Sequence, residues 1–264
     1  MHLLGTLAAG LITAALAANT AGGQEEQADG LPTLNAEVDA WYATASGWIF
    51  ITRGSQPGSA TRAREGRDFD LDPEFLPTGE AWLRFWGPHA LGFRIVPAEE
   101  SGTRTTSQDF IYHGETYPAG REVHADVGFL LVDVDYRYRW ELSTDLTLTP
   151  HLGAEYWGFS SHLRTVDALP SIDEKRSFSS GYWLAGADVE ATLVGPLRAR
   201  ATLLGGITGS DRYFLQAAAG ASLALRSGLS LTADFRVHDV RFHTSTNVAN
   251  LLFWGPSVGL EARF

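Results

Sequence analysis

The sequence predicts an all-β protein: a closed, antiparallel, up-and-down transmembrane β-barrel of about ten strands. Three observations lead to this prediction. Apolar side chains recur at every second position over most of the chain, tight turns alternate with long polar loops, and aromatic side chains gather near the ends of the alternating segments. A period of two is that of a β-strand, because successive side chains point to opposite faces of the sheet.

The alternation is clearest in residues 130–141, LLVDVDYRYRWE. Every even-numbered residue from Leu130 to Trp140 is apolar or aromatic, and every odd-numbered residue from Asp133 to Glu141 is charged. Residues 197–203 and 229–237 alternate in the same way. Convincing helical periodicity is not found in the part of the chain that carries this pattern, which excludes a helical bundle.

The alternating segments are the expected strands: 34–52, 78–87, 89–97, 122–141, 145–160, 178–194, 196–207, 212–226, 228–243 and 250–264. Tight turns are expected at 87–88, 142–144, 195–196 and 227–228, and long loops at 53–77, 98–121 and 161–177. Tight turns on one side and long loops on the other are typical of a membrane-spanning barrel. An even number of strands places both ends of the barrel on the side of the tight turns.

Alternation alone does not tell which face points inward, since a soluble lipocalin-like barrel alternates too. The lengths of the strands and the aromatic residues favour the membrane arrangement. Several expected strands are longer than the roughly 9–11 residues that cross a bilayer. The aromatic residues form two expected interfacial belts. The belt near the tight turns contains Phe85, Trp86, Tyr136, Tyr138 and Trp140, and the belt near the long loops contains Trp48, Phe50, Tyr156, Trp157, Phe159, Tyr182, Trp183, Tyr213, Phe214, Phe253 and Trp254.

The first part of the chain differs from the rest. Residues 1–18 are mostly apolar or small and include the cleavage pattern Ala15-Leu16-Ala17, which predicts a cleaved export signal. Residues 19–33 are small, polar and acidic and predict a disordered leader. The barrel domain is therefore expected to span residues 34–264.

The composition excludes several classes of function. The 264 residues include no Cys, so disulfide frameworks, thiolate metal sites and cysteine nucleophiles are excluded. The formal net charge of −11 argues against nucleic acid as a partner, because nucleic acid selects basic surfaces. The sequence contains no phosphate-binding loop or dinucleotide-binding motif, and no cofactor is expected.

Together, the export signal, the even set of amphipathic strands and a last strand that ends in Phe264 resemble the small outer-membrane β-barrel proteins of Gram-negative bacteria, with an OmpA- or OmpW-like architecture. Leu260 and Ala262 continue the alternate apolar positions of that family's last strand. The resemblance implies contact with outer-membrane lipid and lipopolysaccharide, and recognition of the last strand, with Phe264 as its signal, by the barrel-assembly machinery. It implies no activity, because barrels of this size have many functions.

If the charged face points inward, the barrel encloses a dense charge network. The expected members are Glu37, Asp39, Arg84, Arg94, Asp133, Asp135, Arg137, Arg139, Glu155, Asp188, Glu190, Arg198, Arg200, Asp234, Arg236, Glu261 and Arg263. A barrel of this size is only slightly wider than one that its own side chains fill. The sequence therefore favours a lumen plugged by ion pairs and a non-enzymatic structural or surface-interaction role, with a narrow charged pore or a small-ligand transporter as the alternative.

Weaker candidates lie in the loops. Asp68, Asp70 and Asp72 stand at alternate positions and could bind Ca²⁺, although the pattern departs from the EF-hand loop. Arg53, Arg62, Arg64 and Arg67 are candidate contacts to lipopolysaccharide phosphates.

Two classes of enzyme are known among such barrels, and the sequence offers candidate residues for both. Residues 238–239, His238 and Asp239, are adjacent and thus point to opposite faces, which disfavours an omptin-type protease. His243 and Ser245 share a face, as a base and its nucleophile must in a lipid A deacylase. The acid of such a site is not evident on the last strand, so this enzyme is the least favoured hypothesis.

Overall fold

The computed structural model describes residues 33–264, except residues 57, 66, 67, 69, 70, 167–170, 210, 227 and 245. The predicted export signal, and the leader up to residue 32, lie outside the described residues. No helix in the described part of the chain is long and apolar enough to cross a membrane.

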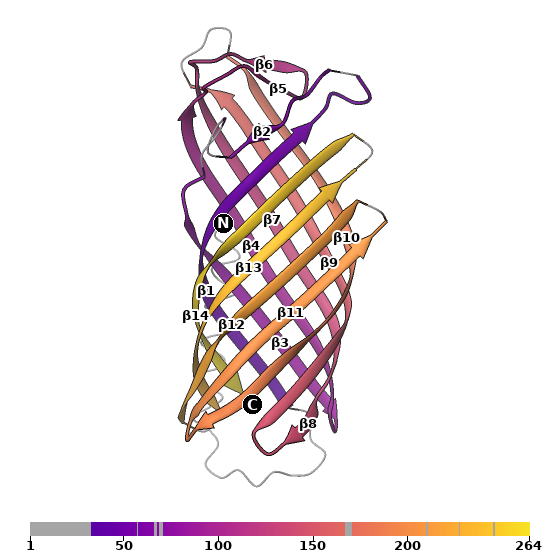
Figure 1. Cartoon of the computed structure of the whole chain (residues 1–264), viewed down its shortest axis with the longest axis vertical. Helices are drawn as coiled ribbons and strands as arrows, with labels where there is room; N and C mark the ends of the chain where they lie inside the picture. Colours follow the sequence, from indigo (N-terminus) through magenta and orange to yellow (C-terminus); the bar gives the residue numbers. More distant parts are fainter. Residues whose placement is uncertain are drawn as a thin grey trace.

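Ten long strands form a closed antiparallel barrel (Figure 1). They are β1 (Thr33–Ile51), β3 (Glu74–Trp86), β4 (His89–Thr105), β7 (Glu122–Tyr138), β9 (Leu146–Thr165), β10 (Asp173–Val194), β11 (Leu197–Thr208), β12 (Arg212–Arg226), β13 (Leu229–His243) and β14 (Asn247–Arg263). Each long strand pairs with the long strands before and after it in the chain, and β14 pairs with β1 to close the ring. The predicted fold class and up-and-down order are confirmed.

The two ends of the barrel differ as the sequence predicts, except that the predicted long loop 161–177 is shortened to residues 166–172, because β9 continues to Thr165 and β10 begins at Asp173. Tight turns join β3 to β4, β10 to β11 and β12 to β13 at one end, which we call the turn end (bottom of Figure 1). A short strand, β8 (Trp140–Ser143), extends the β7–β9 connection at the same end. The start of β1 and the end of β14 also lie at this end and are joined there, since the Phe264 N–H donates to the Leu34 carbonyl (2.8 Å).

The opposite end, the loop end, carries the other short strands (top of Figure 1). Strand β2 (Ala63–Arg64) lies in the β1–β3 connection and pairs with β1. Strands β5 (Phe110–Tyr112) and β6 (Glu115–Tyr117) form a hairpin in the β4–β7 connection. The two residues of its turn, His113 and Gly114, have φ values of 51° and 85°, as a type I′ hairpin turn requires.

Strand β4 is longer than predicted, because it continues to Thr105 rather than ending at residue 97. Pro97 and the acids after it suggested a loop. In the structure β3 pairs with β4 only as far as the pair of Gly79 and Ile95, so Pro97 lies where β4 has one long-strand neighbour. A proline is tolerated at such an edge because fewer backbone N–H groups are needed for the ladder.

The apolar face changes sides part-way along the strands, as β7 shows. From Leu130 to Tyr138 the outward residues are apolar or aromatic, whereas those from Glu122 to Gly128 are charged, polar or glycine. The inward residues do the reverse: Val123 to Leu131 are apolar, and the next three are charged. The turn-end half therefore has the wall expected in lipid, and the loop-end half has the wall of a water-soluble barrel.

Candidate functional site: the barrel interior

The interior has two layers, a charged layer in the turn-end half and an apolar layer in the loop-end half. Both layers consist of inward-pointing side chains of the same strands. Every second residue of a strand points inward along its whole length, but these residues are charged near the turn end and apolar near the loop end. Candidate functions of the protein depend on whether these layers leave a path through the barrel.

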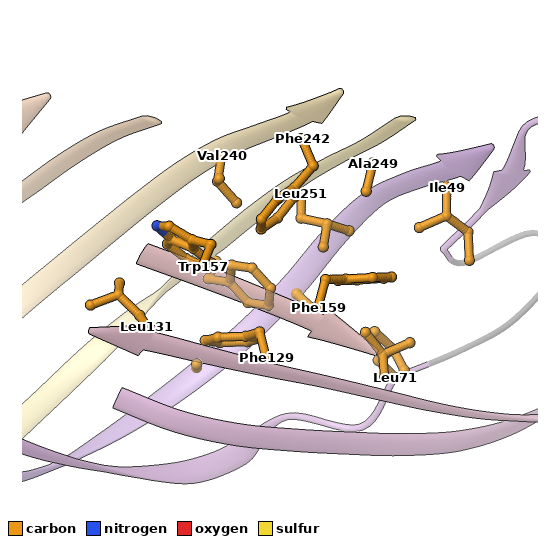
Figure 2. Close-up of a cluster of buried hydrophobic side chains, with 14 of the residues drawn as sticks. Ile49, Leu71, Phe129, Leu131, Trp157, Phe159, Val240, Phe242, Ala249 and Leu251 are labelled. Atoms are coloured by element: carbon orange, nitrogen blue, oxygen red, sulfur yellow. The ribbon is translucent and has the colours of Figure 1, made fainter. Parts of the chain in front are cut away.

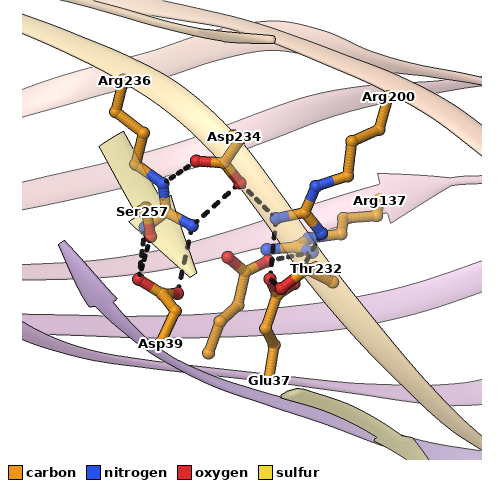
Figure 3. Close-up of polar contacts among 9 residues, drawn as sticks. Glu37, Asp39, Arg137, Arg200, Thr232, Asp234, Arg236 and Ser257 are labelled. Carbon is orange, nitrogen blue, oxygen red and sulfur yellow. Dashed lines mark hydrogen bonds and ion pairs between the residues drawn. The ribbon is translucent and has the colours of Figure 1, made fainter. Parts of the chain in front are cut away.

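A first group of ion pairs joins β1, β11 and β13 (Figure 3). Arg200 donates to both carboxylate oxygens of Glu37 (2.7 and 2.9 Å) and to Asp234 (2.6 Å). Arg236 donates to both oxygens of Asp39 (2.9 and 3.1 Å) and to Asp234 (2.7 Å). Asp234 thus bridges the two arginines, and forked contacts of this kind are the strong form of the ion pair.

Hydroxyl groups complete the hydrogen bonding of this group. Thr232 donates to Glu37 (3.0 Å) and Ser257 donates to Asp39 (2.9 Å). Both hydroxyl residues are buried. These hydroxyl groups donate to carboxylate lone pairs that the guanidinium groups do not occupy. A buried ion pair needs such additional hydrogen bonds in order to be stable.

A second group joins β3, β7, β9 and β10. Arg137 donates to Asp135 (2.8 Å) and Glu80 (2.7 Å). The two ring nitrogens of His151 lie 2.7 Å from Asp135 and 2.9 Å from Asp188. Gly92 on β4 makes room for this group, because a Cβ atom at that position would stand 2.3 Å from the Asp135 carboxylate.

A third group lies beneath the apolar layer. Arg94 donates to Asp133 (2.6 Å) and lies 3.6 Å from Glu155. Glu155 also accepts a hydrogen bond from the Trp157 indole. The ring of Trp157 then packs edge-on against that of His238, with centroids 4.9 Å apart. This group therefore links the charged layer to the apolar one.

The remaining predicted residues lie at the mouth of the turn end. Arg198 pairs with Glu190 (3.2 Å), and Arg263 donates to Asn35 (2.9 Å) and lies 4.0 Å from Glu261. Arg139 pairs with Glu141 (3.2 Å) in a more exposed position. Arg84 faces the same mouth, close enough to Arg139 and Arg263 for electrostatic interaction.

The sequence-based list omitted several residues that the structure places in the network. His151, Thr232 and Ser257 all contact predicted members. Each occupies an inward position by parity, so the alternation could have identified them. His151 on β9 contacts Asp135 and Asp188, which lie on its two neighbouring long strands, β7 and β10.

A cavity of about 170 Å³ lies within the charged layer. Arg84, Arg139 and Arg263 line it at the mouth, and Leu184 and Leu204 line it where the apolar layer begins. Its lining includes eight carboxylates, seven arginines and one histidine, namely Glu37, Glu80, Asp133, Asp135, Asp188, Glu190, Asp234, Glu261, Arg84, Arg94, Arg137, Arg139, Arg200, Arg236, Arg263 and His151. Acids and bases are therefore nearly balanced around the cavity.

The apolar layer fills the interior above the charges (Figure 2). Phe129 packs on Phe253 with ring centroids 4.5 Å apart, and Trp157 packs on Phe242 at 5.5 Å. Phe159 contacts Phe242 as well, at 5.8 Å. Strands from opposite parts of the wall supply these rings, and their side chains are almost completely buried. We call this cluster the apolar plug.

The predicted aromatic belt near the long loops is therefore wrong for five of its members. Trp157, Phe159, Tyr182, Phe214 and Phe253 are buried inside the barrel, each with an exposed fraction of 3% or less. Tyr156, Trp183 and Trp254 are exposed on the outer wall, as predicted. The error arose because neighbouring aromatics in the chain were assigned to one belt, although adjacent side chains of a strand point to opposite faces.

The β5–β6 hairpin covers the plug at the loop end. Phe110, Tyr112 and Tyr117 of the hairpin belong to the same buried cluster. The Tyr117 hydroxyl donates to the Leu163 carbonyl (2.9 Å), and the Tyr112 hydroxyl is 2.6 Å from that of Ser161. Burial raises the pKa of Tyr112 to about 12, so the hydroxyl stays protonated at neutral pH.

The candidate calcium ligands of the first loop do not share one face. The Asp68 carboxylate is buried and accepts the Arg64 N–H (2.9 Å), whereas Asp72 is exposed and Asp70 lies outside the described residues. No three His, Asp or Glu side chains stand in a metal-binding arrangement in the described part of the chain.

The other loop candidates are separated too. Arg53 pairs with Glu115 (2.6 Å), and the Arg62 guanidinium lies 4.6 Å from the centre of the Trp48 ring. Arg67 and Ser245 lie outside the described residues, so neither the full arginine cluster nor the pairing of His243 with Ser245 is described. His243 itself lies 3.5 Å from Asp211.

Comparison with solved structures decides the fold. The outer-membrane protease OmpT from Escherichia coli is similar to this chain with a TM-score of 0.60 and 8% identity, over 88% of this chain and 97% of that one. The chain has the fold of an outer-membrane β-barrel. The similarity shows the fold alone, because an activity cannot be inferred from 8% sequence identity.

Two further outer-membrane barrels are less similar. The translocator domain of the autotransporter NalP from Neisseria meningitidis has a TM-score of 0.42 and 11% identity, over 98% of each chain. The attachment invasion locus protein Ail of Yersinia pestis has a TM-score of 0.38 and 11% identity, over 89% of this chain and all of that one. No protein-family model and no curated protein matches the sequence of this outer-membrane β-barrel.

Proposed function

We propose that this protein is an integral outer-membrane β-barrel with a closed lumen, whose role is structural or surface-interacting and not enzymatic. The observation that carries the proposal is the apolar plug. It lies above the ion pairs and below the β5–β6 hairpin, so the interior holds two kinds of barrier in series.

Ion conduction requires a path that keeps an ion hydrated or supplies polar ligands in place of water. The apolar plug supplies neither, because its rings contact one another across the barrel. In the charged layer Arg200 is paired with Glu37 and Arg236 with Asp39, so a passing ion would have to break pairs that are buried. Both layers therefore favour the hypothesis of a plugged barrel and disfavour that of a narrow pore.

The outer wall supports a role at the cell surface. The apolar outward residues of β7 lie in its turn-end half, and the outward residues of its loop-end half are mostly polar. In this proposal the apolar half lies in outer-membrane lipid, and the polar half projects beyond it at the height of lipopolysaccharide. The loop-end half then presents a rigid surface, because its own interior is packed.

Single-channel recording in planar bilayers tests the closed lumen. The wild-type barrel is expected to show no steady conductance steps. The double variant Trp157→Ala and Phe242→Ala opens only the plug, in which both side chains are fully buried, so it is expected to produce steps only when Arg200→Ala also removes an ion pair of the charged layer. Trp183→Ala, which removes an exposed aromatic of the outer wall, is the matched control and should stay silent. Steady steps from the wild type that change when Arg200 or Asp133 is neutralised would replace the plug with a charged pore.

A further inference from the structure

The mouth of the turn end carries an arginine that no carboxylate neutralises. Arg84 makes no hydrogen bond and no ion pair within the described part of the chain, whereas the other arginines of the mouth each have a carboxylate close by. Those pairs are Arg139 with Glu141 (3.2 Å), Arg198 with Glu190 (3.2 Å) and Arg263 with Glu261 (4.0 Å). The mouth therefore has one positive charge in excess.

Arg84, Arg139 and Arg263 lie close together, and we call them the mouth arginines. Arg84 on β3 and Arg263 on β14 stand on the two neighbouring strands of β1 and pair with residues of β1 that are two positions apart. Arg139 follows β7, and its N–H donates to the Pro88 carbonyl (2.8 Å) in the tight turn after β3. All three line the entrance of the cavity of about 170 Å³ in the charged layer. Their like charges repel one another at this distance.

A buried amide beside the mouth arginines also has an unpaired donor. Asn35 on β1 has an exposed fraction of 1% and lies opposite Arg263 in the sheet. Its Oδ1 atom accepts a hydrogen bond from Arg263 (2.9 Å), but its Nδ2 atom makes no hydrogen bond. A buried donor without an acceptor is unfavourable. The Arg84 guanidinium and the Asn35 amide are both donors, so the group that satisfies them is an acceptor.

We propose that the mouth arginines and the Asn35 amide bind the oxyanion, a carboxylate or phosphate group, of a small solute at the turn end. A guanidinium presents its N–H donors in a planar fork that matches both of these groups. The single positive charge in excess is neutralised by one such group. The cavity behind the entrance has room for the remaining atoms of a small solute.

Other classes of ligand fit this place less well. A cation would meet the repulsion of the mouth arginines, and an apolar molecule would leave the donors unpaired. Glu141 also acts on Arg84 electrostatically, but it is paired with Arg139 and its side chain is 70% exposed, so it competes with a ligand only weakly. In the orientation proposed above, the turn end faces the periplasm and the solute enters from there; this point alone rests on the proposed function.

Calorimetric titration of the folded full-length barrel in a nonionic detergent tests the site. The probes are inorganic phosphate and acetate, added at constant ionic strength so that screening stays the same. At least one probe is expected to bind the wild type, and the one that binds more tightly identifies the group. Arg84→Gln is expected to weaken that binding about tenfold, because a hydrogen bond to a charged group contributes that much. Glu141→Gln is expected to strengthen it, because Arg139 then loses its carboxylate partner.

Arg226→Gln is the matched control for Arg84→Gln. Arg226 is the last residue of β12 and also lies at the turn end, but it does not line the cavity. The control removes the same charge from the same end of the barrel, so its binding should equal that of the wild type. Heat-modifiable gel mobility verifies that each variant is folded before titration.

Binding of neither probe to the folded wild type overturns the proposal. An Arg84→Gln variant that binds as tightly as the wild type overturns it too. Equal weakening in Arg84→Gln and Arg226→Gln also overturns it, since net charge alone would then attract the anion. Conductance measures the closed lumen separately, so the failure of this site would leave the proposed function unaffected.

Discussion

Asp39 on β1 and Arg236 on β13 are joined by two hydrogen bonds, 2.9 and 3.1 Å long, although β14 lies between their strands. Arg236 also contacts Asp234, so its removal leaves the buried Asp39 without its guanidinium partner and leaves Asp234 with Arg200 alone. We expect Arg236→Met to lower the free energy of unfolding by about 3–5 kcal/mol, because breaking a buried pair leaves an uncompensated charge. Urea unfolding in lipid vesicles, followed by tryptophan fluorescence, measures this loss.

The control for this prediction is Arg139→Met. Arg139 pairs with Glu141 in a position where both side chains are substantially exposed, and an exposed pair contributes at most about 1 kcal/mol. Equal losses in the two variants would contradict a stabilising role for the interior network.

A second prediction concerns the β5–β6 hairpin that covers the apolar plug. Tyr112→Ala removes a fully buried ring and its contact with Ser161, so the hairpin should detach more often from the plug. We expect faster trypsin cleavage at Arg121 in folded protein, with the barrel otherwise intact. Ile111→Ala is the control within the same hairpin, because that side chain is only partly buried. Identical cleavage rates in both variants and the wild type would show that the hairpin does not depend on Tyr112.

A third prediction concerns the pH dependence of stability through Glu100, a buried residue of β4 that lies in the loop-end half, beyond the apolar belt of the outer wall. The pKa of Glu100 is raised from 4.5 to about 8 on folding, so the folded state binds more protons than the unfolded state between these values. Its contribution to stability is complete below pH 4.5 and is lost as the pH rises through 8. The free energy of unfolding should therefore fall by a few kcal/mol over this range. Glu100→Gln should lose this part of the slope, and an unchanged slope would exclude Glu100 as its source.

A fourth prediction concerns the last residue of the barrel, Phe264. Phe264 is exposed beside Leu34, and its backbone pairs with that residue through hydrogen bonds in both directions. Phe264→Ala keeps those backbone bonds, so refolding in detergent should be nearly unchanged. If the assembly machinery reads Phe264, the amount of folded barrel in outer membranes of living cells should drop severalfold. Equal amounts of variant and wild type in those membranes would remove Phe264 as the signal.

The charges of the turn-end half were predictable from the chain. In residues 133–139 the charged positions keep one parity and the apolar positions keep the other, which determines that they share a face. Their partners were not predictable, because Glu37 and Arg200 are 163 positions apart and meet only through closure of the barrel and its register. The same limit hid the surroundings of Glu100 on β4, because its acidic neighbours Glu74 and Glu65 come from β3 and from the connection before it.

The apolar plug was missed although the sequence carries a signal for it. Four consecutive apolar residues, Phe129 to Val132, mark the point where the apolar face of β7 changes sides, and Leu251 to Trp254 mark it on β14. Alternation by itself therefore determined the strands, the turns and the residues that share a face. The tertiary structure decided which face is inside at each height, because alternation does not tell which of the two parities points inward and only neighbours across the barrel distinguish lipid from core.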